Sequence, residues 1–304
     1  MSGLGYFLHL LMELKMRNDA QFRSSVLVTG SSGFLGSLII NSLKDEYHLL
    51  GVSRSDTNPY FYQCDLTSDE KVTELAQLIS PDVIIHAAGL KNIQFCEENP
   101  EIAYMVNSQA VKNIASHFPA AKIIYISTDY VFSGDDGMYL EQDVPNPKTV
   151  YGKSKYEGEI IGRKIAGKNF KVVRTASIFS ENSSFINYLR DSIANNVPIK
   201  SYSDCVFSPT YINDLVASLK TLIEGDYTQD IFHVVGDEIS RYYFAKAYFE
   251  VGNYDLKNLV KSENKGEHIY LFKNLSLSGA VTENNLSLHP TKLKVAFSKF
   301  ISAS

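Results

Sequence analysis

Residues 26–36 read Val-Leu-Val-Thr-Gly-Ser-Ser-Gly-Phe-Leu-Gly, an apolar run followed at once by a glycine-rich turn. The run 26–29 has the composition of a buried strand, and 35–43 continues as a helical pattern. The turn glycines Gly30, Gly33 and Gly36 would allow a tight turn, close backbone approach to a pyrophosphate, and close packing of helix on strand. A turn without a ligand is the competing interpretation, but the flanking strand and helix favour a cofactor site. We expect the whole turn to contact the cofactor, through Gly30, Ser32, Gly33, Phe34, Leu35 and Gly36.

Outward from this stretch, strand-like runs alternate with helical patterns as far as residue 175. The runs 83–86 and 122–127 lack polar alternation, which is typical of parallel strands buried on both faces. This rhythm predicts an α/β fold with a Rossmann-like, doubly wound parallel sheet and a smaller C-terminal substrate-binding lobe. The expected organisation is an N-terminal extension at 1–24, an NAD(P)-binding Rossmann domain with the catalytic helix at 25–175, and mainly the substrate-binding lobe at 176–304, with a strand that could return to the sheet.

Composition and charge narrow the class of protein. A net charge of -5 and a pI near 5.8 give no sign of the basic surface that binds nucleic acid. Cys64, Cys96 and Cys205 lie far apart, so we expect free thiols in a reducing cytosol and no metal site. The segment 4–16 is too short and charged to span a membrane, and is either an amphipathic surface helix or an extension ahead of the fold. We expect a soluble cytoplasmic protein. Whether it forms a homodimer stays an open question.

Further cofactor contacts are expected where the later strands end. Ser53-Arg54 follows the second strand, where an acidic residue would bind the ribose 2'-hydroxyl of NAD(H), and an arginine suits a 2'-phosphate instead. We therefore expect NADP(H), while NAD(H) stays open because Asp56 lies close by. Asp65-Leu66 and Ala87-Ala88-Gly89 sit where adenine and ribose would lie. His86 is expected to pack at its strand end rather than to act as a base.

Tyr151 and Lys155 carry the predicted chemistry. A Tyr-x-x-x-Lys spacing places a phenol and an ammonium on one helical face, where the ammonium lowers the tyrosine pKa and binds the cofactor ribose. The same spacing recurs at Tyr242/Lys246, which we interpret as ordinary helix surface. The context separates the two pairs, because only the first follows a strand that ends in hydroxyls. Thr128 is expected to orient a substrate carbonyl, with Ser127 as the alternative.

At these residues the chain resembles the extended short-chain dehydrogenase/reductases, most closely the dTDP-4-dehydrorhamnose reductase group, from about Val26 to Phe297. The marks are the glycine-rich turn, Pro81-Asp-Val-Ile-Ile-His-Ala-Ala-Gly89, Tyr104-Met-Val-Asn107, Ser127-Thr-Asp-Tyr-Val-Phe132, Tyr151-Gly-Lys-Ser-Lys155, Arg174-Thr175, Ser208-Pro-Thr210 and Asp214-Leu215.

The resemblance implies that Thr128, Tyr151 and Lys155 form a catalytic triad, and that Asp129 and Tyr130 approach the sugar beside Thr128. We also expect Lys91 to bind the substrate, although Lys91-Asn92 after Ala87-Ala88-Gly89 is unusual for this group. The resemblance further implies NADPH-dependent reduction of a 4-keto-6-deoxy nucleotide sugar. Two alternatives stay open: an epimerase or dehydratase with tightly held NAD, and a non-catalytic subunit like the beta subunit of methionine adenosyltransferase. The chain departs from these reductases at 174–180, which lacks their tryptophan and glycine, and at Ser208, where many relatives place a phosphate-binding arginine.

Overall fold

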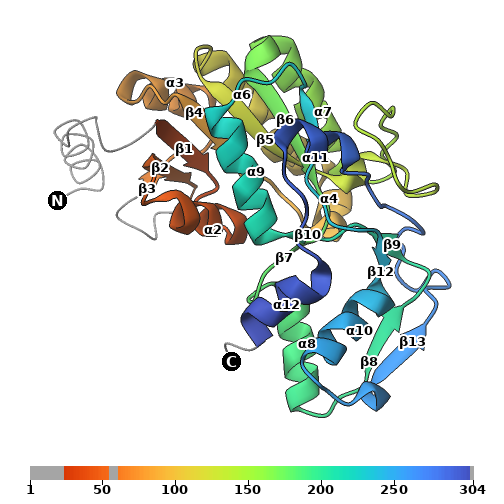
Figure 1. Ribbon diagram of the computed structural model, residues 1–304. Helices are drawn as coiled ribbons and strands as arrows, with labels where there is room; N and C mark the ends of the chain where they lie inside the picture. The colour runs from red at the N-terminus through yellow and green to blue at the C-terminus, as the bar shows by residue number, and fades with distance from the viewer. Residues whose placement is uncertain (1–23, 55–60, 302–304) are drawn as a thin grey trace. The chain divides into compact units, whose positions relative to one another are not determined.

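The computed structural model describes residues 24–54 and 61–301 and contains a seven-stranded sheet of order β11-β6-β5-β4-β1-β2-β3 (Figure 1). β1 pairs in parallel with β2 and with β4, and the sheet extends in parallel from β2 to β3 and from β4 to β5. Later strands lie on both sides of β1 in this order, as in a doubly wound sheet. The sheet therefore confirms the predicted α/β, Rossmann-like fold. The strands are β1 Ser25–Thr29, β2 His48–Ser53, β3 Phe61–Gln63, β4 Val83–His86, β5 Lys122–Thr128, β6 Phe170–Thr175 and β11 Ile231–His233.

Strand β1 shows why the sheet is the core. Val26, Leu27 and Val28 are fully buried, as are Ile84 and Ile85 of the neighbouring β4. Side chains on both faces of these strands are therefore removed from water, each contributing roughly 2 kcal/mol of hydrophobic stabilisation.

Helices follow the strands as the alternation predicts, except after β4, where α4 was not expected and the next helix differs from its expected form. The pattern at 103–117 predicts a single helix, whereas the structure has the end of α5, a π-helical turn η1 and then α6. A π-helical turn holds one more residue than an α-helical turn, and such turns recur at functional sites. The helices are α2 Phe34–Leu43, α3 Asp69–Leu78, α4 Ile93–Glu98, α5 Pro100–Tyr104, η1 Met105–Gln109, α6 Ala110–His117 and α7 Val150–Ala166.

The chain forms two compact units, and three elements continue from one into the other: β5, β6 and α7. Unit 1 holds the described residues up to Ser127 together with Lys153–Val172 and Gly225–Asp230. Unit 2 holds Thr128–Gly152, Val173–Glu224 and the described residues from Ile231 onward. The domain limits expected from the sequence stay a prediction.

Unit 2 has its own aromatic core. The ring of Phe297 makes edge contacts with Phe179, Phe244 and Tyr248, with centroids 5.6, 5.1 and 5.3 Å away. Edge-to-face contacts of this kind suit the ring quadrupole. Its further elements are η2 Asp129–Val131, β7 Ile178–Phe179, α8 Ser184–Ala194, β8 Ile199–Tyr202, β9 Val206–Phe207, β10 Thr210–Tyr211, α9 Ile212–Glu224, β12 Ile239–Ser240, α10 Arg241–Val251, β13 Leu259–Ser262, α11 Ala280–Leu286 and α12 Leu293–Ile301.

Some expectations fall at or beyond the edge of the described chain. The segment 4–16 and Asp56 lie outside the described residues. Among the residues that are described, no helix combines the length and apolar character needed to cross a bilayer. All three cysteines are buried free thiols, as expected.

Candidate active site

The glycine-rich turn between β1 and α2 fits the approach of a phosphate backbone. Gly30 has a φ of +67°, and a Cβ there would lie 2.8 Å from the Cα of Ala88. The Gly33 amide donates to the Gly30 carbonyl at 2.9 Å, and a Cβ on Gly36 would overlap that same carbonyl. Larger residues at Gly30 or Gly36 would therefore push the turn apart. Ser32 and Gly33 are exposed at its tip, where backbone amides can meet an anion.

Thr29 ties the end of β1 to the end of β4. Its hydroxyl accepts from the Ala88 amide at 3.2 Å and lies 3.0 Å from His86 Nδ1. Burial, and secondly the nearby Lys155, lower the pKa of His86 to about 3. His86 is thus a neutral, buried strand-end residue, which confirms its expected packing role.

The segments predicted to meet the adenosine end of the cofactor lie together in unit 1. The Cys64 amide donates to the Ser53 carbonyl at 2.9 Å, and Gln63 Nε2 donates to the Arg54 carbonyl at 3.1 Å. These bonds join the ends of β2 and β3 and leave the Arg54 side chain exposed. Asp65 Oδ1 accepts from the amide and hydroxyl of Thr67 at 3.0 and 2.8 Å, an Asx turn that shapes the loop after β3.

Lys155 lies beside the loop that follows β4. Lys155 is 5 % exposed, and its Nζ donates to the Ile126 carbonyl at 2.7 Å. The ammonium sits 4.0 Å above the centroid of the Tyr125 ring, and a Cβ on Gly89 would lie 3.7 Å from Nζ. Burial lowers the pKa of Lys155 to about 7, and the charge of Glu159 acts in the opposite direction. The lysine therefore stands next to the predicted cofactor loop, one helical turn after Tyr151 on α7.

Glu159 binds one of the two strand-end hydroxyls. It is 1 % exposed, and Ser127 donates to its Oε1 at 2.5 Å. Thr128 also donates to a buried carboxylate, that of Asp129, so its choice over Ser127 as the residue that orients a substrate stays a prediction.

Asn107, in the π-helical turn, holds the loop after β4. Its side chain accepts from the Leu90 amide at 2.8 Å and donates to the Leu90 carbonyl at 3.1 Å and to Ser154 at 3.0 Å. The backbone carbonyl of Asn107 accepts from the Tyr125 hydroxyl at 3.2 Å. One buried carboxamide thus links the predicted cofactor loop to helix α7.

The substrate-side residues of unit 2 form a second group. Thr128 donates to Asp129 Oδ1 at 2.9 Å, and both side chains are buried. Burial raises the pKa of Asp129 to about 7, against the bond from Thr128 and the charge of Arg241. The Tyr130 hydroxyl donates to the Tyr270 carbonyl at 2.8 Å, and its ring meets the ring of Tyr151 at 62° with centroids 5.8 Å apart.

Gly152 explains how α7 begins so close to this group. A Cβ on Gly152 would overlap the Tyr130 carbonyl oxygen, so the helix can approach the η2 turn only with glycine there. This approach keeps Tyr151 against Tyr130. The second Tyr-x-x-x-Lys pair lies on α10, where Lys246 forms an ion pair with Glu250 at 3.6 Å on the helix surface, as interpreted from the sequence.

Lys91 and Ser208, two positions where the sequence departs from its relatives, lie in different surroundings. The Lys91 ammonium lies 5.6 Å from the centroid of the Phe34 ring, so it spans from the loop after β4 to the start of α2. Ser208 is fully buried and donates to the Leu277 carbonyl at 3.0 Å, which leaves it no phosphate-binding role. Arg241 stacks on the neighbouring Phe207, with its guanidinium 4.9 Å from the ring centroid.

The sequence analysis assigned no role to Asn107, Glu159 or Arg241. Glu159 stands four residues after Lys155, so the helical spacing could have pointed to it. Asn107 stands in the stretch Tyr104-Met-Val-Asn107 that marks the family resemblance, but its contacts, like those of Arg241, join distant segments and do not follow from a local pattern.

Comparisons with known proteins show what this chain is similar to. The sequence profile of the RmlD substrate binding domain matches residues 24–301. The chain is 31% identical to the dTDP-4-dehydrorhamnose reductase of Mycolicibacterium smegmatis over 74% of its own length and 68% of the relative. It is 32% identical to methionine adenosyltransferase 2 subunit beta of Danio rerio over 70% of its length and 69% of the relative. Among solved structures, dTDP-4-dehydrorhamnose reductase of Bacillus anthracis in complex with NADP is similar, with a TM-score of 0.82, 26% identity, and coverage of 93% of this chain and 100% of that one.

Proposed function

We propose that this chain, which belongs to the RmlD substrate binding domain family, is an NADPH-dependent reductase of a 4-keto-6-deoxy nucleotide sugar. The similarity to dTDP-4-dehydrorhamnose reductases, one of them solved with NADP, supports both the reaction and the cofactor. The exposed Arg54 at the end of β2, where a 2'-phosphate would lie, supports NADPH over NADH.

The observation that carries this proposal is the position of Lys155. Its ammonium is buried against the backbone of Gly89 at the carboxyl end of β4, one turn after Tyr151 on the same helix. In a doubly wound sheet the ligand crevice lies at the carboxyl ends of the strands. A cation at that place suits the two expected roles of Lys155, which are to bind the cofactor ribose and to favour proton release by the phenol of Tyr151.

Tyr151, Lys155 and Thr128 then have separate roles in the proposed reduction. NADPH, held by the glycine-rich turn and Lys155, would supply a hydride for C4 of the sugar, and the carbonyl oxygen would gain negative charge. Tyr151 donates its phenolic proton to that oxygen. Lys155 stabilises the resulting phenolate and lowers the tyrosine pKa, while Thr128 orients the carbonyl.

A direct test mixes the purified chain with NADPH and dTDP-4-dehydrorhamnose and follows the absorbance of NADPH. We expect turnover, and Tyr151→Phe should lower kcat by about 100-fold or more while NADPH still binds, because only the proton donor is lost. Tyr242→Phe, in the second Tyr-x-x-x-Lys pair, is the matched control and should retain activity. Absence of turnover with several 4-keto nucleotide sugars, despite cofactor binding, would refute the proposal. Copurifying NAD would favour an epimerase or dehydratase.

The similarity to methionine adenosyltransferase 2 subunit beta favours a second candidate, a non-catalytic regulatory subunit. This candidate predicts stable association with a methionine adenosyltransferase catalytic subunit and no turnover of nucleotide sugars. A pull-down with that catalytic subunit, combined with the turnover assay, separates the two functions.

A further inference from the structure

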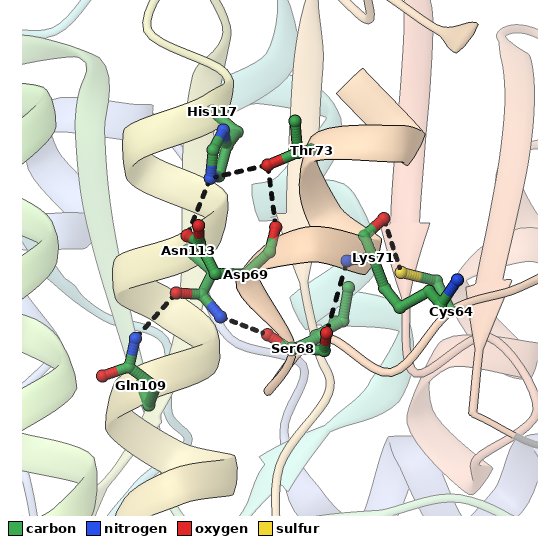
Figure 2. A network of polar contacts seen from close by, with 9 residues as sticks. Cys64, Ser68, Asp69, Lys71, Thr73, Gln109, Asn113 and His117 are labelled. Carbon is green, nitrogen blue, oxygen red and sulfur yellow. Dashed lines mark hydrogen bonds and ion pairs between the residues drawn. The ribbon is translucent and has the colours of Figure 1, made fainter. Parts of the chain in front are cut away.

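Three polar residues on one helical segment face the connection between β3 and α3 (Figure 2). Gln109, Asn113 and His117 stand four residues apart and so share one side of the helix. His117 Nε2 lies 2.9 Å from Asp69 Oδ1 and 3.4 Å from the hydroxyl of Thr73, so it binds the helix α3 itself. Asn113 reaches instead to the loop before α3.

Asn113 donates from Nδ2 to the carbonyl of Leu66 at 2.9 Å, and its Oδ1 accepts from Gln109 Nε2 at 2.7 Å. Because the Gln109 amide occupies the oxygen, the Asn113 amide group has to face the Leu66 carbonyl. Asn113 is 1 % exposed. A buried polar side chain is costly unless it is paired, and an apolar residue would pack the same space at lower cost. Fixing the Leu66 backbone is therefore what the asparagine accomplishes.

The loop that Asn113 fixes contains the Asp65-Leu66 segment. On its own side the loop is shaped by the Asx turn of Asp65 with Thr67, and the Ser68 amide donates to the Asp65 carbonyl at 3.1 Å. Ser68 then caps α3 by accepting from the Lys71 amide. These bonds define the turn internally, whereas the contact from α6 anchors it to a neighbouring element through Leu66.

We propose that Asn113 is a positioning residue for the adenosine half of the cofactor, acting by holding the Leu66 carbonyl and with it the Asp65-Leu66 backbone. This inference rests on the proposed function, since it takes the loop after β3 to line the adenosine end of the site. Asn113 contacts neither the sugar nor the reacting atoms. It should therefore govern affinity for the cofactor and leave the chemical step unchanged.

The test compares Asn113→Leu with Thr73→Val, a control in the same pair of helices that does not contact Leu66. Binding of 2',5'-ADP, which is the adenosine half of NADPH, and of dTDP is measured by titration calorimetry. We expect Asn113→Leu to weaken 2',5'-ADP binding and to raise the KM for NADPH about tenfold, as loss of one buried hydrogen bond allows. The kcat at saturating NADPH and the affinity for dTDP should stay as in the unmodified protein. Thr73→Val should change none of these quantities.

Unchanged affinity for 2',5'-ADP in Asn113→Leu would overturn the proposal, and so would a parallel loss of dTDP binding, because that outcome indicates a general loss of structure. Should Asn113→Leu fail to fold, Gln109→Leu removes the donor that orients Asn113 and should weaken 2',5'-ADP binding about threefold. An unmodified protein that binds 2',5'-ADP but reduces no sugar would refute the proposed reaction and leave the role of Asn113 intact. An unmodified protein that binds no 2',5'-ADP would overturn both.

Discussion

Lys155 and Glu159 lie one turn apart on α7, and both are buried. Loss of hydration lowers the pKa of the Lys155 ammonium to about 7, and the charge of Glu159 raises it in opposition. Only the protonated lysine can stabilise the phenolate of Tyr151. Glu159 therefore keeps the protonated form of Lys155 populated near neutral pH. The hydroxyl of Ser127 donates to the same carboxylate and so links it to the end of β5.

Glu159→Gln should move the alkaline limb of the kcat/KM profile to lower pH by about one unit. The titratable groups that face Lys155 are Glu159 on its own helix, the neutral His86 on β4 and Tyr125 on β5. Of these, only Glu159 favours the ammonium by its charge, so its removal lowers the lysine pKa, and activity is lost at a lower pH. Glu157→Gln, an exposed site on the same helix, is the control. A limb that stays in place in Glu159→Gln would show that Lys155 does not depend on this carboxylate.

At the scale of elements, the turn from β1 to α2 depends on backbone that approaches backbone. Gly30 combines a positive φ with a Cβ position close to Ala88, whereas Gly167, with a φ of +54°, has no atom within 4 Å of its Cβ position. The two glycines thus share the conformational requirement, and only Gly30 adds a steric one.

Gly167→Ala should lose about 1 kcal/mol of stability, because alanine is strained at positive φ. Gly30→Ala should lose more, because its Cβ would also press on the backbone of Ala88. Gly30→Ala should in addition weaken NADPH binding by more than about tenfold, since the turn has to move away from the loop after β4. Fluorescence titration with NADPH and thermal unfolding measure the two effects separately. Equal cofactor affinity in the two variants would contradict the proposed role of this turn.

How far the sequence predicts these elements depends on how local their causes are. The glycine turn, the buried strands and the shared helix of Tyr151 and Lys155 follow from patterns within one strand, turn or helix, and they were predictable. The doubly wound sheet was expected from the alternation of strands and helices. The bond from Asn113 to Leu66 joins residues 47 positions apart, and the bond from Ser127 to Glu159 joins residues 32 apart. Such pairs are fixed by packing between elements. The π-helical turn around Asn107 is likewise invisible to a pattern that reads 103–117 as one regular helix.

At the scale of the whole molecule, each unit contains a buried histidine whose pKa is lowered to about 3. Burial is the main cause for both, aided by Lys155 at His86 in unit 1 and by Arg174 at His233 in unit 2. The unfolded chain takes up protons on its histidines near pH 6.5 and the folded chain does not, so stability is lost as the pH falls below 6.5. Unit 2 also holds Asp129, whose pKa is raised to about 7. The folded form of that group binds its proton first, so acidification from pH 7 stabilises it.

These opposing groups predict that the two units respond differently to acid. At pH 5 each histidine removes about 2 kcal/mol of stability, while protonation of Asp129 returns about 2 kcal/mol relative to pH 7, so unit 1 should weaken and unit 2 should change little. Native-state hydrogen exchange at pH 7 and pH 5, corrected for intrinsic rates, measures this for the amides of each unit. His86→Gln should flatten the pH dependence of unit 1, because the group that titrates is gone. His289→Gln, at a side chain that is 81% exposed, should leave it unchanged. An equal loss of protection in both units would show that Asp129 does not offset His233.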